Sequence, residues 1–144
     1  MHNVLFIEDE KKGVFSYLKH LERRGFHCEL AKDGDEAIQK LQNGKFDILS
    51  LDVMFDPGRV YLKNKDPRRS GLQLLELIRS SEILNCNPDM NVIVLTAVAS
   101  QEIEYKMREL GVFDYLKKPM PFDDVIERFV VAAKEGSKQE AVQE

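Results

Sequence analysis

The stretch "FDILSLDVMF", residues 46–55, has the pattern of a buried strand that ends in an acid. Ile48, Leu49 and Leu51 suit a strand that is covered on both faces, as the strands of parallel sheets usually are. Asp52 then places a carboxylate where the apolar run stops. A single Asp in this position is most often a turn or helix-capping residue. Its role therefore depends on what the rest of the chain brings to the same place.

Apolar runs and segments of helical period alternate along the chain on both sides of this strand. The other strand-like runs lie at 4–7, 92–95 and 112–116, with a weaker one at 27–30. The helical segments lie at 14–25, 33–44, 70–81, 100–111 and 122–134. Such alternation predicts parallel strands joined by right-handed helical crossovers. We therefore predict an α/β fold, a doubly wound five-stranded parallel sheet with helices on both faces.

Length and composition limit the class of protein. A chain of 144 residues is expected to form one domain, here residues 1–134, followed by a polar tail at 135–144 that frays. The net charge of −4 gives no general attraction to nucleic acid or anionic membranes. No apolar run approaches the roughly 20 residues that a membrane span needs. Because the sequence goes straight into a strand-like run, we expect no signal peptide. We expect a cytoplasmic protein.

The cysteines and histidines show no ligand pattern. Cys28 and Cys86 are too few and too simply spaced for a disulfide framework or a zinc site, so we expect reduced thiols. His2, His20 and His27 are isolated from one another and are not expected to bind a metal.

Polar residues follow the predicted strands at the point where each strand ends. Glu8 and Asp9 follow the first strand, Asp52 the third, Thr96 ends the fourth and Lys118 the fifth. The carboxyl ends of parallel strands meet at one edge of the sheet, where sites form in doubly wound folds. We therefore expect three acids, one hydroxyl and one amine to gather there.

This set of groups favours phosphoryl chemistry. Three close carboxylates repel one another unless a cation intervenes, and an all-oxygen cluster suits Mg²⁺, for which Mn²⁺ could substitute. Asp52 would then act as a nucleophile that forms an aspartyl phosphate. Mg²⁺ and Lys118 would neutralise the charge on the phosphoryl oxygens, and Thr96 could donate a hydrogen bond to one of them.

The motifs "VLFIEDE", "FDILSLDVMF", "SGLQLLELIR", "VIVLTA" and "FDYLKKP" together resemble the receiver domain of two-component response regulators, the CheY-like superfamily. The resemblance covers residues 3 to about 134. It implies the flavodoxin-like strand order 2-1-3-4-5. Carried over by position, it makes Asp52 the phosphoacceptor. It also makes Asp9, Asp52 and the main-chain carbonyl of Met54 the Mg²⁺ ligands, with Glu8 acting through a water.

The same resemblance implies a switch. Thr96 is the switch hydroxyl, and Tyr115 is the aromatic residue whose rotamer follows it. The Lys118–Pro119 bond is expected to be cis, with Lys118 pointing into the site and Lys117 toward solvent. The readout would pass through the face formed by the fourth helix, fifth strand and fifth helix.

The resemblance also implies partners. The phosphoryl donor would be a sensor histidine kinase or a histidine phosphotransfer protein, and the downstream target would be another, unidentified protein. A homodimer through the readout face is possible, whereas direct binding to nucleic acid or membrane is not expected. No catalysis is expected beyond Mg²⁺-dependent self-phosphorylation and slow autodephosphorylation.

Alternative functions stay open to different degrees. A dehalogenase-like phosphatase would need a second Asp two residues after Asp52, where Met54 stands. A flavin-binding module would need a phosphate loop after the first strand, where "IEDE" is acidic. The main alternative is a degenerate or loop-blocked receiver that binds proteins without phosphorylation.

The chain departs from the family pattern after Asp52. Pro57 is displaced by one position, and the matching glycine, Gly71, comes nineteen residues after Asp52, so residues 56–70 form an insertion. Its charged residues, five basic and two acidic, give +3: they are Arg59, Lys63, Lys65, Arg68 and Arg69 against Asp56 and Asp66. It is either a solvated, mobile segment without a role, or a loop that covers the acidic site or docks a partner through these basic residues and Tyr61.

Met54 and Val98 occupy the positions that tune hydrolysis of the aspartyl phosphate in this family. Neither side chain can position or polarise a water, which predicts a long-lived phosphoryl state. Six of the eight phenylalanines are expected to lie in or beside the core: Phe15, Phe26, Phe46, Phe113, Phe122 and Phe129. Tyr105 is expected to be exposed.

Overall fold

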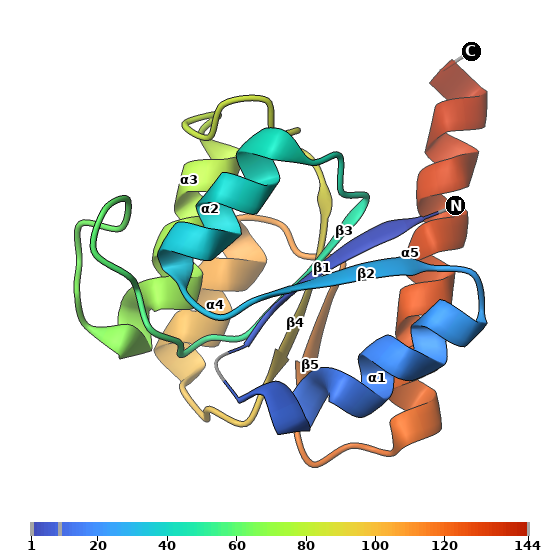
Figure 1. The fold of residues 1–144 in the computed structure, drawn as a ribbon, viewed down its shortest axis with the longest axis horizontal. Coiled ribbons are helices and arrows are strands. Elements are labelled where there is room, and N and C mark those ends of the chain that lie inside the picture. The colour runs from blue at the N-terminus through green and yellow to red at the C-terminus, as the bar shows by residue number, and fades with distance from the viewer. Residues whose placement is uncertain (1, 9, 144) are drawn as a thin grey trace.

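A computed structural model describes residues 2–8 and 10–143, with no description of the side chains of residues 11, 12 and 136–143. Within these ranges, five parallel strands form one sheet in the order β2-β1-β3-β4-β5, the order that was predicted (Figure 1). The strands are β1 (Asn3–Ile7), β2 (His27–Ala31), β3 (Ile48–Leu51), β4 (Asn91–Thr96) and β5 (Asp114–Lys117).

The helices form a layer on each face of this sheet. They are α1 (Lys11–Arg23), α2 (Gly34–Asn43), α3 (Ser70–Arg79), α4 (Gln101–Glu109) and α5 (Phe122–Gln143). Helices α2, α3 and α4 bury one apolar cluster against the sheet, and α1 and α5 bury a second on the other face (Figure 1). The strands are nearly all buried because both faces are covered, which explains their continuous apolar sequences.

Local sequence signals set the ends of several helices. The Asp33 side chain accepts a hydrogen bond from the Glu36 amide at 2.8 Å, which caps α2. The Ser100 hydroxyl accepts one from the Ile103 amide at 3.3 Å, which caps α4. Gly111 follows α4 with a positive φ of 86°, a conformation that favours glycine.

Helix α5 is longer than expected, because it continues to Gln143 through most of the segment predicted to be a frayed tail (Figure 1). The expectation rested on the absence of an apolar stripe after residue 134. Seven of the ten residues at 135–144 are Glu, Gln, Lys or Ala, which have high helix propensity. Among the described residues, no helix has the length and apolar character needed to span a membrane.

The insertion after β3 is packed against the rest of the molecule. It contains a short 3₁₀ turn, η1 (Pro67–Arg69), which leads directly into α3. Leu62 is fully buried and joins the core under α2, and Pro57 is also buried. The interpretation of a segment solvated along its whole length is therefore wrong.

Phe15 is an exception to the expectation that the aromatic residues lie in or beside the core. Its side chain is 55% exposed on α1, where the Lys19 ammonium lies 5.2 Å from the ring centre. Tyr105 on α4 is exposed, as expected.

Candidate functional site

The sheet register brings the ends of β1 and β3 side by side. Ile7 pairs with Leu51, so the next residues, Glu8 and Asp52, are neighbours at the carboxyl edge. The Asp52 amide donates a hydrogen bond to the Ile7 carbonyl at 3.4 Å, which extends the strand pairing to the acid itself. The Asp52 side chain accepts a hydrogen bond from the Val53 amide at 2.7 Å and remains partly exposed.

Glu8 is a buried acid beside another acid. Burial and the negative charge of Asp52 raise the pKa of Glu8 from 4.5 to about 7, and the positive charge of Lys118 opposes this change. Burial makes the larger contribution, because it disfavours the charged form of the carboxyl, and the repulsion from Asp52 adds to it. The pair therefore has the electrostatic character of a site for an added cation.

Lys118 points into this acidic site. Its Nζ atom lies 3.4 Å from Glu8 Oε2, and its side chain is largely buried. Lys117 points the other way and forms an exposed ion pair with Glu104 at 2.7 Å. The Lys118–Pro119 peptide bond is cis. The two lysines thus have the orientations expected from the sequence.

Thr96 lies at the end of β4, next to the lysine. Its side chain is fully buried, and its hydroxyl oxygen accepts a hydrogen bond from the Val98 amide at 3.1 Å. The Thr96 carbonyl accepts a hydrogen bond from the Lys118 amide at 2.8 Å. This hydrogen bond joins the end of β4, which carries the Thr96 hydroxyl, to the end of β5, which leads to the Lys118 amine.

Tyr115 is buried in β5, and its ring lies against α4. The guanidinium carbon of Arg108 is 5.4 Å from the ring centre, and Arg108 also pairs with Glu104 at 3.0 Å. Burial and the negative charge of Glu104 raise the pKa of Tyr115. Glu104 also pairs with Lys117 of β5. This acid therefore connects α4 to β5 next to Tyr115.

Gly71 supports the backbone of the site from α3. A Cβ atom at this position would lie 2.4 Å from the Asp52 carbonyl oxygen, so only glycine allows this approach. The Gly71 amide donates to the Val53 carbonyl at 3.0 Å. The preceding residue, Ser70, is fully buried and donates its hydroxyl hydrogen to the Phe55 carbonyl at 2.7 Å. The sequence identified the place of Gly71, but gave no sign of the role of Ser70.

Two residues of α2 hold the insertion, and the sequence analysis missed both. The Gly34 amide donates to the Asp56 carbonyl at 2.8 Å. The Asp35 carboxylate accepts hydrogen bonds from three successive loop amides, those of Arg59, Val60 and Tyr61, at 2.7, 3.0 and 3.2 Å. Partial burial raises the pKa of Asp35, but these hydrogen bonds outweigh burial and hold it below its usual value. A short acid in the first turn of a helix is so common that no sequence signal distinguishes this one.

The residues expected to tune hydrolysis lie at the rim. Met54 is 44% exposed, and Val98 is half-buried against the core. Neither carries a group that can bind or polarise water.

The donor set fits a hard divalent cation. Carboxylate oxygens are the ligands that Mg²⁺ prefers, and Glu8 and Asp52 supply them from neighbouring strands. Asp9, the third expected acid, lies outside the described residues, and no group of three metal-binding side chains forms among the described ones. Both cysteines are free thiols, as expected, and contribute nothing to the site.

Comparison with known proteins agrees with this arrangement. A family described as "Response regulator receiver domain" matches residues 4–130. The transcriptional regulatory protein CusR of Escherichia coli is 30% identical over 134 residues, which are 93% of this chain and 52% of CusR. The chain thus spans about half the length of the curated relatives it matches.

Solved structures show the same fold. The signal receiver domain of a LuxO repressor protein from Vibrio parahaemolyticus superposes with a TM-score of 0.80 at 22% identity, covering 99% of this chain and 98% of that one. A response regulator from Burkholderia pseudomallei, solved with a phosphorylated aspartic acid, a calcium ion and citrate, has a TM-score of 0.65 at 26% identity. The superposition covers 99% of this chain and 75% of the Burkholderia chain. With the receiver family matched across almost all of its length, the chain belongs to the response regulator receiver domains, a family of signalling modules rather than enzymes.

Proposed function

We propose that this receiver domain takes a phosphoryl group onto Asp52 from a sensor histidine kinase or a histidine phosphotransfer protein. The observation that carries the proposal is the placement of a partly exposed Asp52 beside the buried Glu8, with the Lys118 amine 3.4 Å from Glu8. An acid with this exposure can reach an incoming donor. The exposure of Asp52 also argues against the alternative in which the insertion blocks the site.

The chemistry assigns a role to each of these groups. A carboxylate oxygen of Asp52 forms a bond to phosphorus while the nitrogen–phosphorus bond of the donor phosphohistidine breaks, and the imidazole nitrogen keeps the electron pair. Lys118 stabilises the negative charge on the phosphoryl oxygens, which is the main requirement of this transfer. Mg²⁺, held by Asp52 and Asp9 and the Met54 carbonyl with Glu8 behind a water, would neutralise further charge.

The readout proposed for the site uses Thr96 and Tyr115. A phosphoryl group on Asp52 offers acceptor oxygens that can draw the Thr96 hydroxyl away from the Val98 amide. The loop between β4 and α4 would move with it, and α4 is tied to β5 through Glu104. Tyr115 lies under these contacts, so a shift of α4 would change the face that a downstream protein, or a second copy, can bind.

Acetyl phosphate and Mg²⁺ provide the direct test. The wild-type domain should gain the mass of one phosphoryl group, measured on the intact protein, and Asp52→Ala should gain none. Asp89→Ala is the matched control, because Asp89 is an exposed acid in the loop between α3 and β4, at the opposite edge of the sheet. A wild-type adduct that persists in Asp52→Ala would contradict the proposal.

A kinase arm tests the donor. Purified, phosphorylated histidine kinases should transfer their phosphoryl group to the wild type and to Asp89→Ala, but not to Asp52→Ala. Labelling by acetyl phosphate without transfer from any histidine kinase or phosphotransfer protein would contradict the named donor.

A further inference from the structure

The insertion carries five cations, of which three make contacts within the domain. Lys65 donates to two carbonyl oxygens of the loop itself, at 2.6 and 3.4 Å. Arg68 pairs with Asp66 at 2.9 Å, and Arg69 pairs with Glu102 of α4 at 3.2 Å. Each of these three cations already has a partner within the domain. Of the basic residues expected to meet a partner, they are the ones that the structure uses internally.

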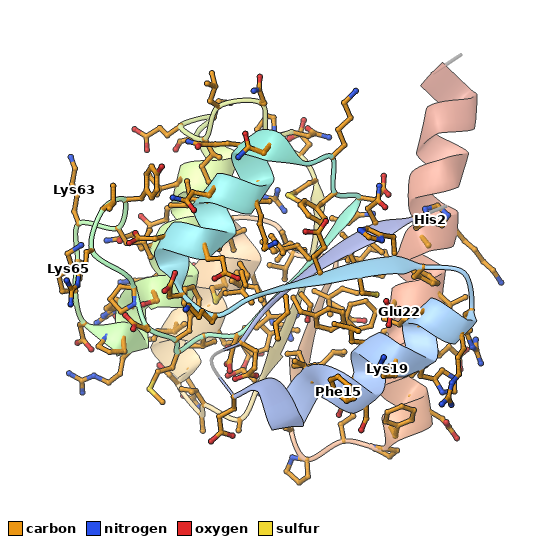
Figure 2. All side chains as sticks on the ribbon, viewed as in Figure 1. His2, Phe15, Lys19, Glu22, Lys63 and Lys65 are labelled. Carbon is orange, nitrogen blue, oxygen red and sulfur yellow. The ribbon has the colours of Figure 1, made fainter. Side chains whose placement is uncertain are left out.

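The two remaining cations face solvent together with an apolar side chain. Arg59 and Lys63 are exposed, and neither forms an ion pair with an acid among the side chains that the structure describes. Val60 lies between them in sequence and is 71% exposed. Figure 2 shows Lys63 extending away from the loop on the side remote from α1. We call residues 58–65, which carry this surface, the cationic knob.

The cationic knob is held in one conformation by contacts outside it. The Asp35 carboxylate accepts hydrogen bonds from the amides of Arg59, Val60 and Tyr61. Leu62 fills a fully buried position in the core, and Tyr61 packs against that core. A partner that binds such a loop does not have to order it first, which removes a main cost of binding through loops.

The cationic knob also lies at the functional edge of the sheet. It packs on the first turn of α2, which begins at the carboxyl end of β2. Asp56, where the insertion starts, pairs with Asp33 in a parallel bridge and comes four residues after Asp52. A protein that reaches the carboxyl edge from the α2 side therefore meets the knob.

We propose that the cationic knob is a docking surface for an acidic segment of a protein partner, in which an apolar residue between acids contacts Val60. Charge complementarity favours this occupant, because the knob is a local positive surface on a protein of net charge −4. The inference does not depend on phosphorylation of Asp52. It concerns a feature of this chain, the insertion, rather than the receiver family as a whole.

The test uses the full chain, labelled with nitrogen-15, and a synthetic peptide of alternating Glu and Asp with one central Leu. Amide shifts on titration should cluster in residues 58–64 and should disappear in 0.5 M salt, because exposed charges are screened. Arg59→Glu with Lys63→Glu should weaken binding roughly tenfold or more. Arg59→Gln with Lys63→Gln should show a smaller loss in the same direction. Charge reversal is preferable to deletion, since a deletion would remove the buried Leu62.

The matched control is Arg24→Glu with Lys45→Glu, which changes the charge equally at the opposite edge of the sheet. Both side chains are exposed, and this variant should bind the peptide as the wild type does. Four results would overturn the proposal: shifts centred outside the knob, equal losses in both double variants, tighter binding of a DNA duplex than of the peptide at the knob, or self-association of the domain through it. Labelling by acetyl phosphate tests the proposed function separately and should be unchanged in every variant.

Discussion

Replacing Gly34 by alanine should destabilise this domain, although the same change in most helices is stabilising. Gly34 is the first residue of α2, and a glycine-to-alanine change within a helix usually gains about 0.5–1 kcal/mol. Here a Cβ atom would lie 2.3 Å from the Pro57 carbonyl oxygen and 2.7 Å from a methyl carbon of Leu62. The first of these atoms belongs to the backbone, so it cannot move without displacing the insertion.

The expected loss of unfolding free energy follows from the contacts that this displacement would break. Overpacking in a rigid environment costs about 1–3 kcal/mol. Shifting the insertion would also strain the hydrogen bonds to Asp35 and the burial of Leu62, itself worth about 1.5–3 kcal/mol when complete. Against the helical gain, we expect a net loss of about 1–3 kcal/mol. For a domain of this size that is a fall in Tm of roughly 3–10 °C.

Gly13→Ala is the matched control for this prediction. Gly13 lies in α1, and a Cβ atom there would have no neighbour within 4 Å. It should therefore show the ordinary gain of about 0.5–1 kcal/mol. Urea unfolding followed by circular dichroism gives both values, and hydrogen exchange at residues 59–61 reports on the insertion. If Gly34→Ala proved as stabilising as Gly13→Ala, with exchange unchanged, the reasoning about this contact would be refuted.

Three further predictions concern the site and the insertion. Because the pKa of Glu8 is raised to about 7 in the folded domain, its ionisation should lower stability as pH rises from about 4.5 to 7. In EDTA, the free energy of unfolding of the wild type should fall relative to that of Glu8→Gln between about pH 4.5 and 7. A difference that stays constant over this range, measured by urea unfolding, would contradict this. Met54→Asn with Val98→Glu should accelerate loss of the phosphoryl group, measured by intact mass over time, because both new side chains can position water; an unchanged rate would remove the proposed basis for a long-lived state. Asp35→Ala should cost about 1–3 kcal/mol and speed amide exchange at residues 59–61, since three donors lose a charged acceptor; unaltered exchange would mean that the insertion is held by its apolar contacts alone.

Much of the fold could be predicted because local and global signals agree. The apolar runs at residues 48–51 and 92–95 are long enough to mark buried strands, and the caps at Asp33 and Ser100 mark where helices begin. The edge that gathers Glu8, Asp52 and Lys118 follows from topology alone, because parallel strands end at one edge.

The insertion could not be predicted in the same way. Its conformation depends on contacts between residues far apart in sequence, such as the Asp35 carboxylate with amides more than twenty positions later. Backbone amides leave no mark in the sequence, and Leu62 is one apolar residue in a polar stretch. Phe15 failed for a related reason: periodicity shows which residues share a helix face, but not which face a neighbouring helix covers.

The base of the insertion sets a condition on moving it between proteins. Residues 56–70 fold against a glycine and an aspartate that they do not contain, Gly34 and Asp35. On a receiver with a larger residue and no acid at the start of its second helix, the same segment would lose both the close packing at Gly34 and the hydrogen bonds to Asp35. The transferable unit is therefore discontinuous, and an engineer who wishes to carry the loop to a new host must transplant a dipeptide of α2 along with it.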